Sequence, residues 1–207
     1  MAVKGPELIK SRCTEIVDAC EKLYHTHGYR DVTIKLISTE TSISRPSIYN
    51  YFQTKEEIFL AVLKREYLRW ADDLKKIRDS SDRMTPEDLA DAIAKTLESR
   101  GVMLKIETMN LYEIEENSRE ERLVEFKKAV CLALSTMDEC IRKFLPELSD
   151  EDRSAIRYCF VPFLYGIYSS TSLTEKQKHA MNRAGMCCAV PGVNDICRIF
   201  LLKLFRP

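Results

Sequence analysis

Apolar residues recur every three or four positions along most of this chain, with polar residues between them. That spacing places the apolar side chains on one face of a helix. Few stretches alternate apolar and polar residues one by one, as half-buried strands do. The pattern therefore predicts an all-α protein of about nine helices, with no low-complexity linker and no internal repeat.

Two short helices joined by a tight turn are expected between Thr33 and Phe52. The Thr33 hydroxyl can accept from the free N–H groups that open the first helix, and Ser44 can do the same for the second. Pro46 falls in the first turn of the second helix, where a missing N–H has no cost. Ile48 and Phe52 have the spacing that fixes this helix against the first. The arrangement is a helix-turn-helix, so DNA is the expected partner.

The second helix of this motif has an outer face that is polar, planar or cationic, whereas a merely solvated helix would more often carry Glu and Lys. Its N-terminal residues would point at base edges if the helix lay in a major groove. For the whole segment, the alternative is an ordinary helical hairpin in an all-α protein. For Tyr51 alone, the alternative is that its side chain packs under the motif. The outer face consists of Arg45, Ser47, Tyr49, Asn50 and Tyr51.

A further helix is expected to start at Lys55, because Thr54 and Glu57 have the spacing of a capping box. Its free N–H groups, its dipole and the Lys55 ammonium favour a DNA phosphate beside the recognition helix. A contact of this kind sets the register on DNA without reading the sequence.

The segment from Ile43 to Phe59, after a helix that ends at His27-Gly28-Tyr29, resembles the tetracycline-repressor (TetR/AcrR) family of bacterial transcription regulators. The resemblance covers roughly the first third of the chain. It implies phosphate contacts at Thr33, Tyr49 and Lys55, and base-facing positions at Ser44, Arg45, Pro46 and Asn50. Arg45 is the first candidate for reading guanine. The full set of candidate DNA contacts is Thr33, Lys35, Ser44, Arg45, Pro46, Ser47, Tyr49, Asn50, Tyr51 and Lys55.

The turn of the motif departs from the family pattern. The family usually has Ala-Gly there, whereas this chain has Thr41-Ser42. Ser42 is therefore expected to adopt the left-handed backbone geometry that Gly adopts at lower cost, which would leave the turn slightly strained.

Three segments are expected along the chain: a DNA-binding domain at 1–53, a connecting helix at 54–78, and a helical ligand-binding and dimerisation domain at 79–207. Reading a palindrome requires two recognition helices one turn of DNA apart, which favours a two-fold homodimer. The resemblance implies an interface of two helices per subunit, with burial in the monomer core as the alternative. The candidates are the helix with Phe160, Phe163 and Ile167 and the terminal helix with Ile199, Phe200 and Leu204.

The family usually senses a small-molecule effector in the second domain. Met103, Met109, Phe126 and Phe160 are candidates to line an adaptable apolar pocket, since methionine and aromatic side chains repack around varied ligands. Ordinary core packing is the alternative. The segment from Val102 to Glu115 is apolar on most sides and is expected in the domain centre.

Charge and hydropathy narrow the class of protein. The 32 basic and 32 acidic residues cancel, whereas a non-specific polyanion binder would be far more basic, so focused contact with double-stranded DNA is favoured. No apolar stretch is long enough to cross a bilayer and no signal-peptide core follows Met1. No membrane partner is expected, and the expected location is cytoplasmic.

The eight cysteines are expected mainly as reduced core thiols, because Cys13 and Cys20 lie on the apolar face of the first helix. Cys187 and Cys188 offer the alternative of a redox- or metal-responsive regulator, with Cys197 as the only nearby third sulfur. No metal site and no cofactor are predicted.

An enzyme is disfavoured, since the chain lacks a glycine-rich phosphate loop, a His-x-x-x-His pair and a Gly-x-Ser-x-Gly elbow, and no catalytic residue is assigned. A helical adaptor that does not bind DNA is the rival of a different class. The prediction is a sequence-specific transcriptional regulator, a ligand-responsive repressor that acts as a homodimer on an inverted-repeat operator.

Overall fold

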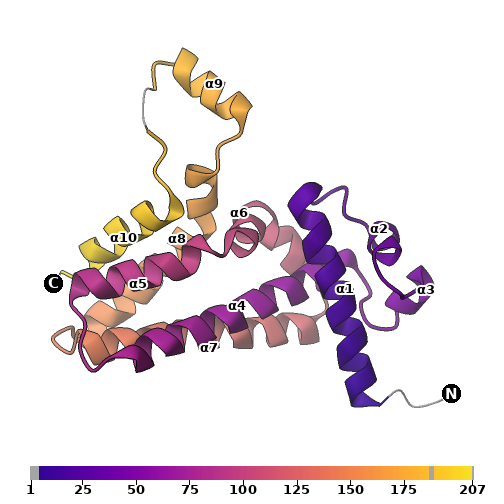
Figure 1. Cartoon of the computed structure of the whole chain (residues 1–207), viewed down its shortest axis with the longest axis horizontal. Coiled ribbons are helices and arrows are strands. Elements are labelled where there is room, and N and C mark those ends of the chain that lie inside the picture. The colour runs from indigo at the N-terminus through magenta and orange to yellow at the C-terminus, as the bar shows by residue number, and fades with distance from the viewer. Residues whose placement is uncertain (1–4, 187–188, 207) are drawn as a thin grey trace. The chain divides into compact units, whose positions relative to one another are not determined.

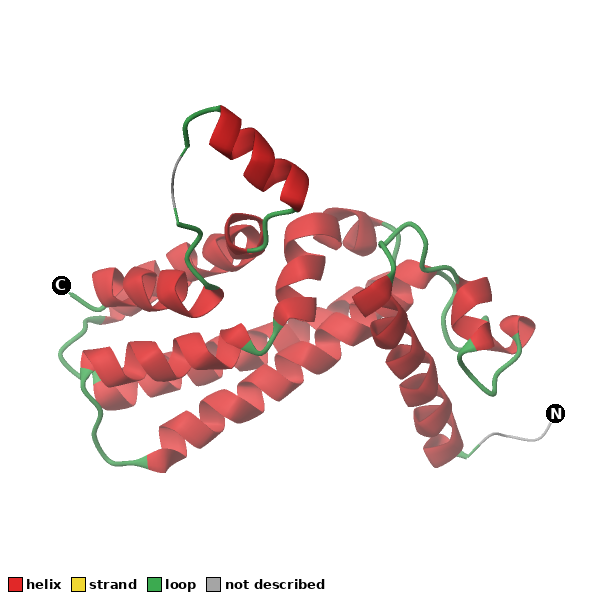
Figure 2. Ribbon diagram, turned by 45° about the horizontal axis from the view of Figure 1, so that its top comes forward, coloured by secondary structure: helices red, strands yellow, loops and turns green. Residues whose placement is uncertain are grey.

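The computed structural model describes residues 5–186 and 189–206, and helix is the only regular secondary structure in those ranges (Figures 1 and 2). The all-α class is confirmed, with ten helices described where about nine were expected. None of these helices is long and apolar enough to cross a membrane. The helices are α1 (Pro6–Thr26), α2 (Ile34–Thr39), α3 (Arg45–Ile48), α4 (Lys55–Ser80), α5 (Pro86–Glu98), α6 (Gly101–Glu116), α7 (Glu120–Phe144), α8 (Asp150–Thr171), α9 (Glu175–Arg183) and α10 (Val193–Leu204).

Side-chain caps begin several helices, and the cap at Thr33 is the one expected above. Thr33, Thr85, Ser149 and Thr174 each accept a hydrogen bond from the backbone N–H three residues later. Each bond satisfies one of the N–H groups that a helix leaves free in its first turn. The start of these helices is therefore fixed by local chemistry.

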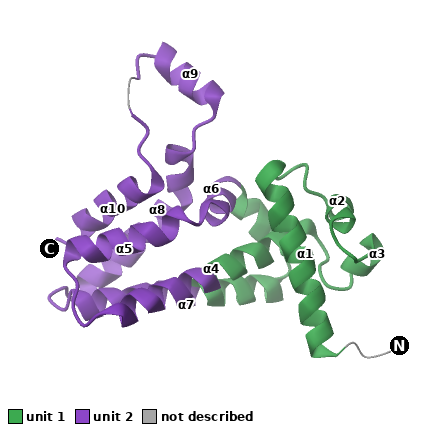
Figure 3. Cartoon of the chain, viewed as in Figure 1, with its two compact units in different colours: residues 1–67, 110–130 green, residues 68–109, 131–207 purple. Residues whose placement is uncertain are grey.

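The chain packs as two compact units (Figure 3). Unit 1 consists of residues 1–67 and 110–130, and unit 2 of residues 68–109 and 131–207. The division falls within α4, α6 and α7, which have residues in both units. The segments 1–53, 54–78 and 79–207 were assigned by expected function and not by packing, so they do not coincide with these units. They remain a prediction.

Unit 1 contains the helix-turn-helix motif, with α2 in contact with both α1 and α3. Its core is apolar and includes two aromatic pairs. The Tyr24 and Phe59 rings meet edge to face with centroids 5.2 Å apart, and Tyr67 and Phe126 do so at 5.7 Å. Ile48 and Phe52 are buried as the sequence predicts, which fixes the second helix of the motif against the rest of the unit.

In unit 2, α10 packs against α5 and α8. The Trp70 indole N–H donates to Thr96 Oγ1 at 2.9 Å, so its polar edge is satisfied in the core. The Phe163 and Phe200 rings stack with centroids 4.2 Å apart.

The candidate dimer residues divide between core and surface. Phe160 and Ile167 are buried in unit 2, with exposed fractions of 0% and 2%, whereas Ile199 is 56% exposed. For Phe160 and Ile167 the monomer-core interpretation is therefore correct. Ile199 keeps an exposed apolar side chain that a second subunit can cover.

The second half of α6 is not buried as expected. Met103 and Ile106 are buried, but Met109 and Tyr112 are 62% and 83% exposed. Met109, Tyr112 and Glu113 follow at helical spacing on an exposed side of α6. The prediction of a helix buried on most sides is wrong for this half, because it took the apolar content of the segment for burial.

Candidate nucleic-acid interface

The turn between α2 and α3 is held by polar side chains of α1. The Glu15 carboxylate accepts from the Ser42 backbone N–H, and Arg12 donates to the Ser42 hydroxyl at 2.6 Å. Arg12 also pairs with Glu15 at 3.3 Å. The hydrogen bonds from Ser42, supported by Arg12, hold the pKa of Glu15 below its ordinary value. The same hydrogen bonds that hold the turn therefore favour the ionised form of Glu15.

Ser42 does not adopt the left-handed geometry expected of it. Gly185 is the one residue with positive φ among those described. The strained-turn prediction is wrong, because hydrogen bonds from α1 and between Thr41 Oγ1 and the Ile43 backbone stabilise an ordinary backbone path.

The second helix of the motif is a single turn. Ser44 is at its N-cap position, but its hydroxyl donates to Ser47 Oγ at 2.9 Å and caps no backbone N–H, contrary to the expectation. Tyr49 and Asn50 follow α3 in a hydrogen-bonded turn, with the Asn50 N–H donating to the Ser47 carbonyl. The predicted recognition helix is thus α3 plus this turn.

Most candidate DNA contacts lie on the surface of unit 1. Tyr49 is 45% exposed, whereas Tyr51 is only 7% exposed and packs under the motif, as the second interpretation held. Tyr51 is therefore withdrawn from the DNA-facing set. Ser47 and Lys55 are half-buried, and the exposed candidates are Thr33, Lys35, Ser44, Arg45, Pro46 and Asn50.

Lys55 begins α4 as predicted, but its ammonium already has contacts. It donates to the Tyr29 carbonyl at 3.0 Å and lies 4.0 Å from the centroid of the Tyr29 ring. The Tyr29 hydroxyl donates to Glu56 at 3.0 Å. Because an ammonium has three donors, the Tyr29 contact leaves capacity for a phosphate oxygen.

The capping box at the start of α4 forms only in part. The Glu57 N–H donates to Thr54 Oγ1 at 3.2 Å, as predicted. The Glu57 carboxylate accepts from the Gln53 N–H at 2.8 Å and from the Arg119 guanidinium, and not from the Thr54 N–H. Burial would raise the pKa of Glu57, but these hydrogen bonds outweigh it and keep the pKa below its ordinary value.

Sequence reasoning missed the residues at the junction of α6 and α7 and in the first turn of α7 that contact this motif. Arg119 forms a two-pronged ion pair with Glu57, at 2.5 and 2.9 Å. Arg122 donates to the Tyr51 carbonyl at 2.9 Å, and Thr54 donates to the Asn117 carbonyl at 3.1 Å. These partners are more than sixty residues apart in sequence, and no local pattern marks such pairs.

The four candidate residues of the effector pocket differ in burial and belong to different units. Met109 is 62% exposed, so it cannot line a closed cavity, and that prediction is wrong. Phe126 packs on Tyr67 in unit 1, whereas Phe160 packs near Trp70 in unit 2. Met103 and Phe160 are buried and remain candidates.

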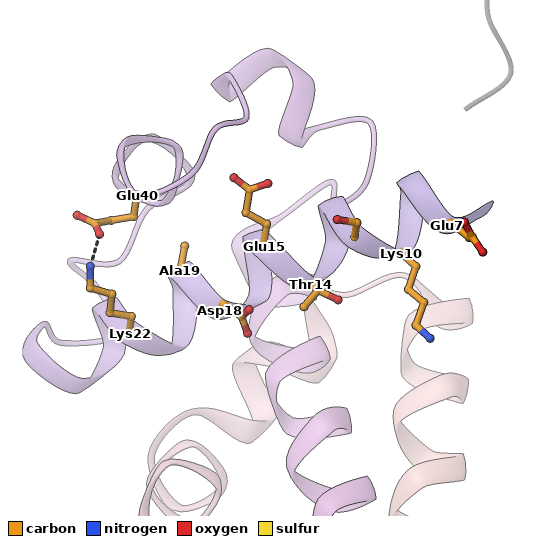
Figure 4. Close-up of a pocket in the computed structure, with 9 residues that line it drawn as sticks. Glu7, Lys10, Thr14, Glu15, Asp18, Ala19, Lys22 and Glu40 are labelled. Carbon is orange, nitrogen blue, oxygen red and sulfur yellow. Dashed lines mark hydrogen bonds and ion pairs between the residues drawn. The ribbon is translucent and has the colours of Figure 1, made fainter. Parts of the chain in front are cut away.

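An open hollow of about 710 Å³ lies along α1 in unit 1 (Figure 4). It contains both acidic and basic side chains, and Lys22 and Glu40 pair across it at 2.6 Å. A surface of mixed charge attracts a polyanion weakly. The DNA-facing side of unit 1 is therefore sought at α2 and α3. The hollow is lined by Glu7, Lys10, Ser11, Thr14, Glu15, Asp18, Ala19, Lys22 and Glu40.

The expectation of core thiols holds for three of the six described cysteines. Cys20, Cys140 and Cys197 are buried, whereas Cys13 is half-buried and Cys131 and Cys159 are exposed. Cys20 and Cys197 are fully buried, and burial raises the pKa of Cys197 to about 12. Cys197 is therefore poorly suited to act as a third sulfur ligand. Cys187 and Cys188 lie outside the described residues. Within the described ranges no group of three His, Cys, Asp or Glu residues is placed to hold a metal.

Two family models match consecutive parts of the chain. The model of bacterial regulatory proteins of the tetR family matches residues 16–62. The model of the tetracyclin repressor-like C-terminal domain matches residues 64–204. Together they cover most of the sequence.

Curated relatives match the N-terminal third. The HTH-type transcriptional regulator HbdR of Aromatoleum sp. (strain CIB) is 37% identical over 62 residues, 30% of this chain and 27% of that protein. The HTH-type transcriptional repressor AcnR of Corynebacterium efficiens is 31% identical over 68 residues, 33% of this chain and 36% of that protein. The aligned part of the chain thus spans about a third of the length of these relatives, or less.

Solved structures are similar over nearly the whole chain. The fatty acid degradation regulator FadR from Bacillus halodurans aligns with a TM-score of 0.61 and 14% identity, over 98% of this chain and 96% of that one. A regulator of the TetR/AcrR family from Thermobifida fusca aligns with a TM-score of 0.62 and 16% identity, over 95% and 97%. At these identities the likeness is one of fold.

Proposed function

Because the chain belongs to the TetR family of bacterial regulatory proteins, we propose that it represses transcription by binding an inverted-repeat operator as a homodimer. A small-molecule effector would control that binding. The observation that supports operator reading is Arg45, which is exposed and has no ion-pair partner within the described residues. Several other arginines of unit 1, such as Arg12, Arg65 and Arg119, are paired with carboxylates. An unpaired guanidinium at the start of α3 suits the major-groove edge of guanine.

The homodimer is supported by an exposed side of α8. Tyr158 is 74% exposed and Tyr165 is 37% exposed, and Pro162 lies between them at helical spacing. Exposed aromatic side chains such as Tyr158 are typical of interfaces. We therefore assign the dimer interface to this side of α8 and to Ile199 on α10. The buried Phe160 and Ile167, which the sequence pattern suggested, are no longer candidates.

The rest of the proposal follows from DNA binding. A regulator of bacterial transcription acts where the DNA is, which supports a cytoplasmic location. No catalytic role is proposed for any residue, and the family is one of regulators.

The test is selection from randomised duplex DNA by the purified protein at moderate salt. We expect enrichment of an inverted repeat. Arg45→Ala should bind the selected duplex with less preference at one base position in each half, losing about 1–3 kcal/mol of discrimination.

Arg183→Ala, which removes an exposed arginine from α9 in unit 2, is the matched control and should select the same repeat. If the wild-type protein enriches no sequence, the helical-adaptor interpretation gains support. If Arg45→Ala keeps full discrimination, the assignment of Arg45 to a base contact is wrong.

A further inference from the structure

The recognition segment has little structure of its own. Its helix, α3, has four residues, and the turn after it ends at Phe52. A single helical turn is unstable in isolation, so its geometry depends on its surroundings. Burial of Ile48, Tyr51 and Phe52 fixes one side of the segment. Its exit, from Tyr51 to Thr54, depends on polar contacts.

Those contacts come from residues 117–122, the junction of α6 and α7, which lies in unit 1. Arg122 donates to the Tyr51 carbonyl at 2.9 Å, and its guanidinium lies 5.4 Å from the centroid of the Phe52 ring. Thr54 donates to the Asn117 carbonyl at 3.1 Å. Both bonds end on the exit of the recognition segment, the stretch from Tyr51 to Thr54.

Glu57 links the same junction to the exit a second time. Its carboxylate accepts from the Gln53 N–H at 2.8 Å and from Arg119 Nε and Nη2 at 2.5 and 2.9 Å. The Glu57 side chain is fully buried, whereas Arg119 is 41% exposed. A buried carboxylate that loses its arginine keeps only part of its hydrogen bonding, which is costly, unlike the loss of a surface ion pair.

We propose that residues 117–122 form a clamp that positions the recognition segment for DNA, with Arg119 and Arg122 as its positioning residues. Here the clamp means the contacts of Asn117, Arg119 and Arg122 with Tyr51, Thr54 and Glu57. This inference rests on the proposed function. Under this proposal, operator affinity depends on two arginines that are remote in sequence from the helix-turn-helix. They act by increasing the fraction of molecules whose recognition segment has the geometry that binds DNA.

The first test uses Glu57→Gln, Arg119→Gln and the double variant, with Lys127→Gln as the matched control. Lys127 pairs with Glu115 between α7 and α6 of the same unit and touches no residue of the recognition segment in the contacts described. Each single variant should lose about tenfold in affinity for the selected operator, within the range usual for coupled sites. The double variant should lose no more than either single one, since the two side chains act as a pair.

Affinity for an unrelated duplex and the salt dependence of operator binding should not change, because the clamp donates to no phosphate. Circular dichroism at the assay temperature identifies variants that have unfolded. Wild-type affinity in the folded single variants overturns the proposal. So does an equal loss on operator and unrelated DNA, which would assign Arg119 to a direct phosphate contact.

Hydrogen exchange of the DNA-free protein tests the clamp independently of any operator. The Gln53 N–H, which donates to Glu57, and the N–H groups of Tyr51 and Phe52 should exchange at least about fivefold faster in Glu57→Gln and Arg122→Met than in Lys127→Gln. Unchanged exchange in folded Arg122→Met excludes the clamp even if operator binding succeeds. If these variants exchange faster but the wild-type protein selects no DNA, the clamp is supported and the proposed function is wrong.

Discussion

Ser42 occupies the turn of the motif with an ordinary backbone geometry, because α1 supplies partners for both of its polar groups. Glu15 accepts from its N–H, and Arg12 donates to its hydroxyl. A glycine therefore has no conformational advantage at this position. It would add flexibility to the unfolded chain and remove the hydroxyl.

Ser42→Gly should therefore lower the free energy of unfolding by about 1 kcal/mol. Urea denaturation followed by circular dichroism measures the change. Ser38→Gly, a substitution of the same kind inside α2, gives the ordinary penalty for glycine in a helix. A gain of stability in Ser42→Gly would mean that this residue is strained after all.

Asp73 provides a charge-dependent contact in unit 2. It pairs with Lys76 at 2.7 Å and with Arg100, whose side chain is only 6% exposed. Burial would raise the pKa of Asp73, but these cations outweigh burial and keep the pKa below its ordinary value. The unfolded chain therefore takes up the proton first as the pH falls. The stabilisation is complete above the unfolded pKa of about 4 and is lost as the pH falls through the folded pKa.

Asp73→Asn should be less stable than wild type by about 1–3 kcal/mol at pH 7, because it removes a carboxylate partner from the buried guanidinium of Arg100. The difference should shrink as the pH falls below about 4. Urea denaturation at pH 7 and at pH 3 measures both values. Asp72→Asn, next in sequence and 66% exposed, should change little. A difference that persists at pH 3 would exclude the charge as its cause.

The N-terminus of α4 is the element that the sequence assigns to phosphate. Lys55→Gln should weaken binding to the selected operator and to an unrelated duplex about equally. It should also reduce the slope of log affinity against log salt by about 1. Lys75→Gln, near the other end of the same helix, should alter neither quantity. Selective loss on the operator alone would contradict the phosphate assignment.

Elements were predictable from sequence where their signals are local. The caps at Thr33, Thr85 and Thr174 follow from residue type and spacing. The α6 surface and the Glu57–Arg119 pair were not predictable, because they depend on which distant segments pack together. The burial of Tyr51 was not predictable for the same reason, because a tyrosine ring is common both on DNA-facing surfaces and in cores.

At the scale of the whole molecule, operator binding depends on pairing of two chains. Tyr158→Asp would put a charge into the proposed interface on α8 and should shift the protein from dimer to monomer with its helix content unchanged. Analytical ultracentrifugation and circular dichroism measure the two properties. Because a monomer presents one recognition helix, operator affinity should fall at least about 100-fold.

Tyr112→Asp is the matched control, since Tyr112 is the more exposed of the two tyrosines, at 83% against 74%, but lies on α6. It should stay dimeric. A Tyr158→Asp protein that remains a dimer would remove α8 from the interface.

The helix α9 lies apart from the other helices of unit 2, and none of its residues is buried (Figure 3). Its own capping box and the left-handed Gly185 after it define its two ends. Trypsin can therefore cut at Lys176, Lys178 or Arg183 without first opening a core. The C-terminal fragment would stay attached, since α10 packs against α5 and α8. The nicked protein should be a non-covalent complex of two fragments that still folds as one.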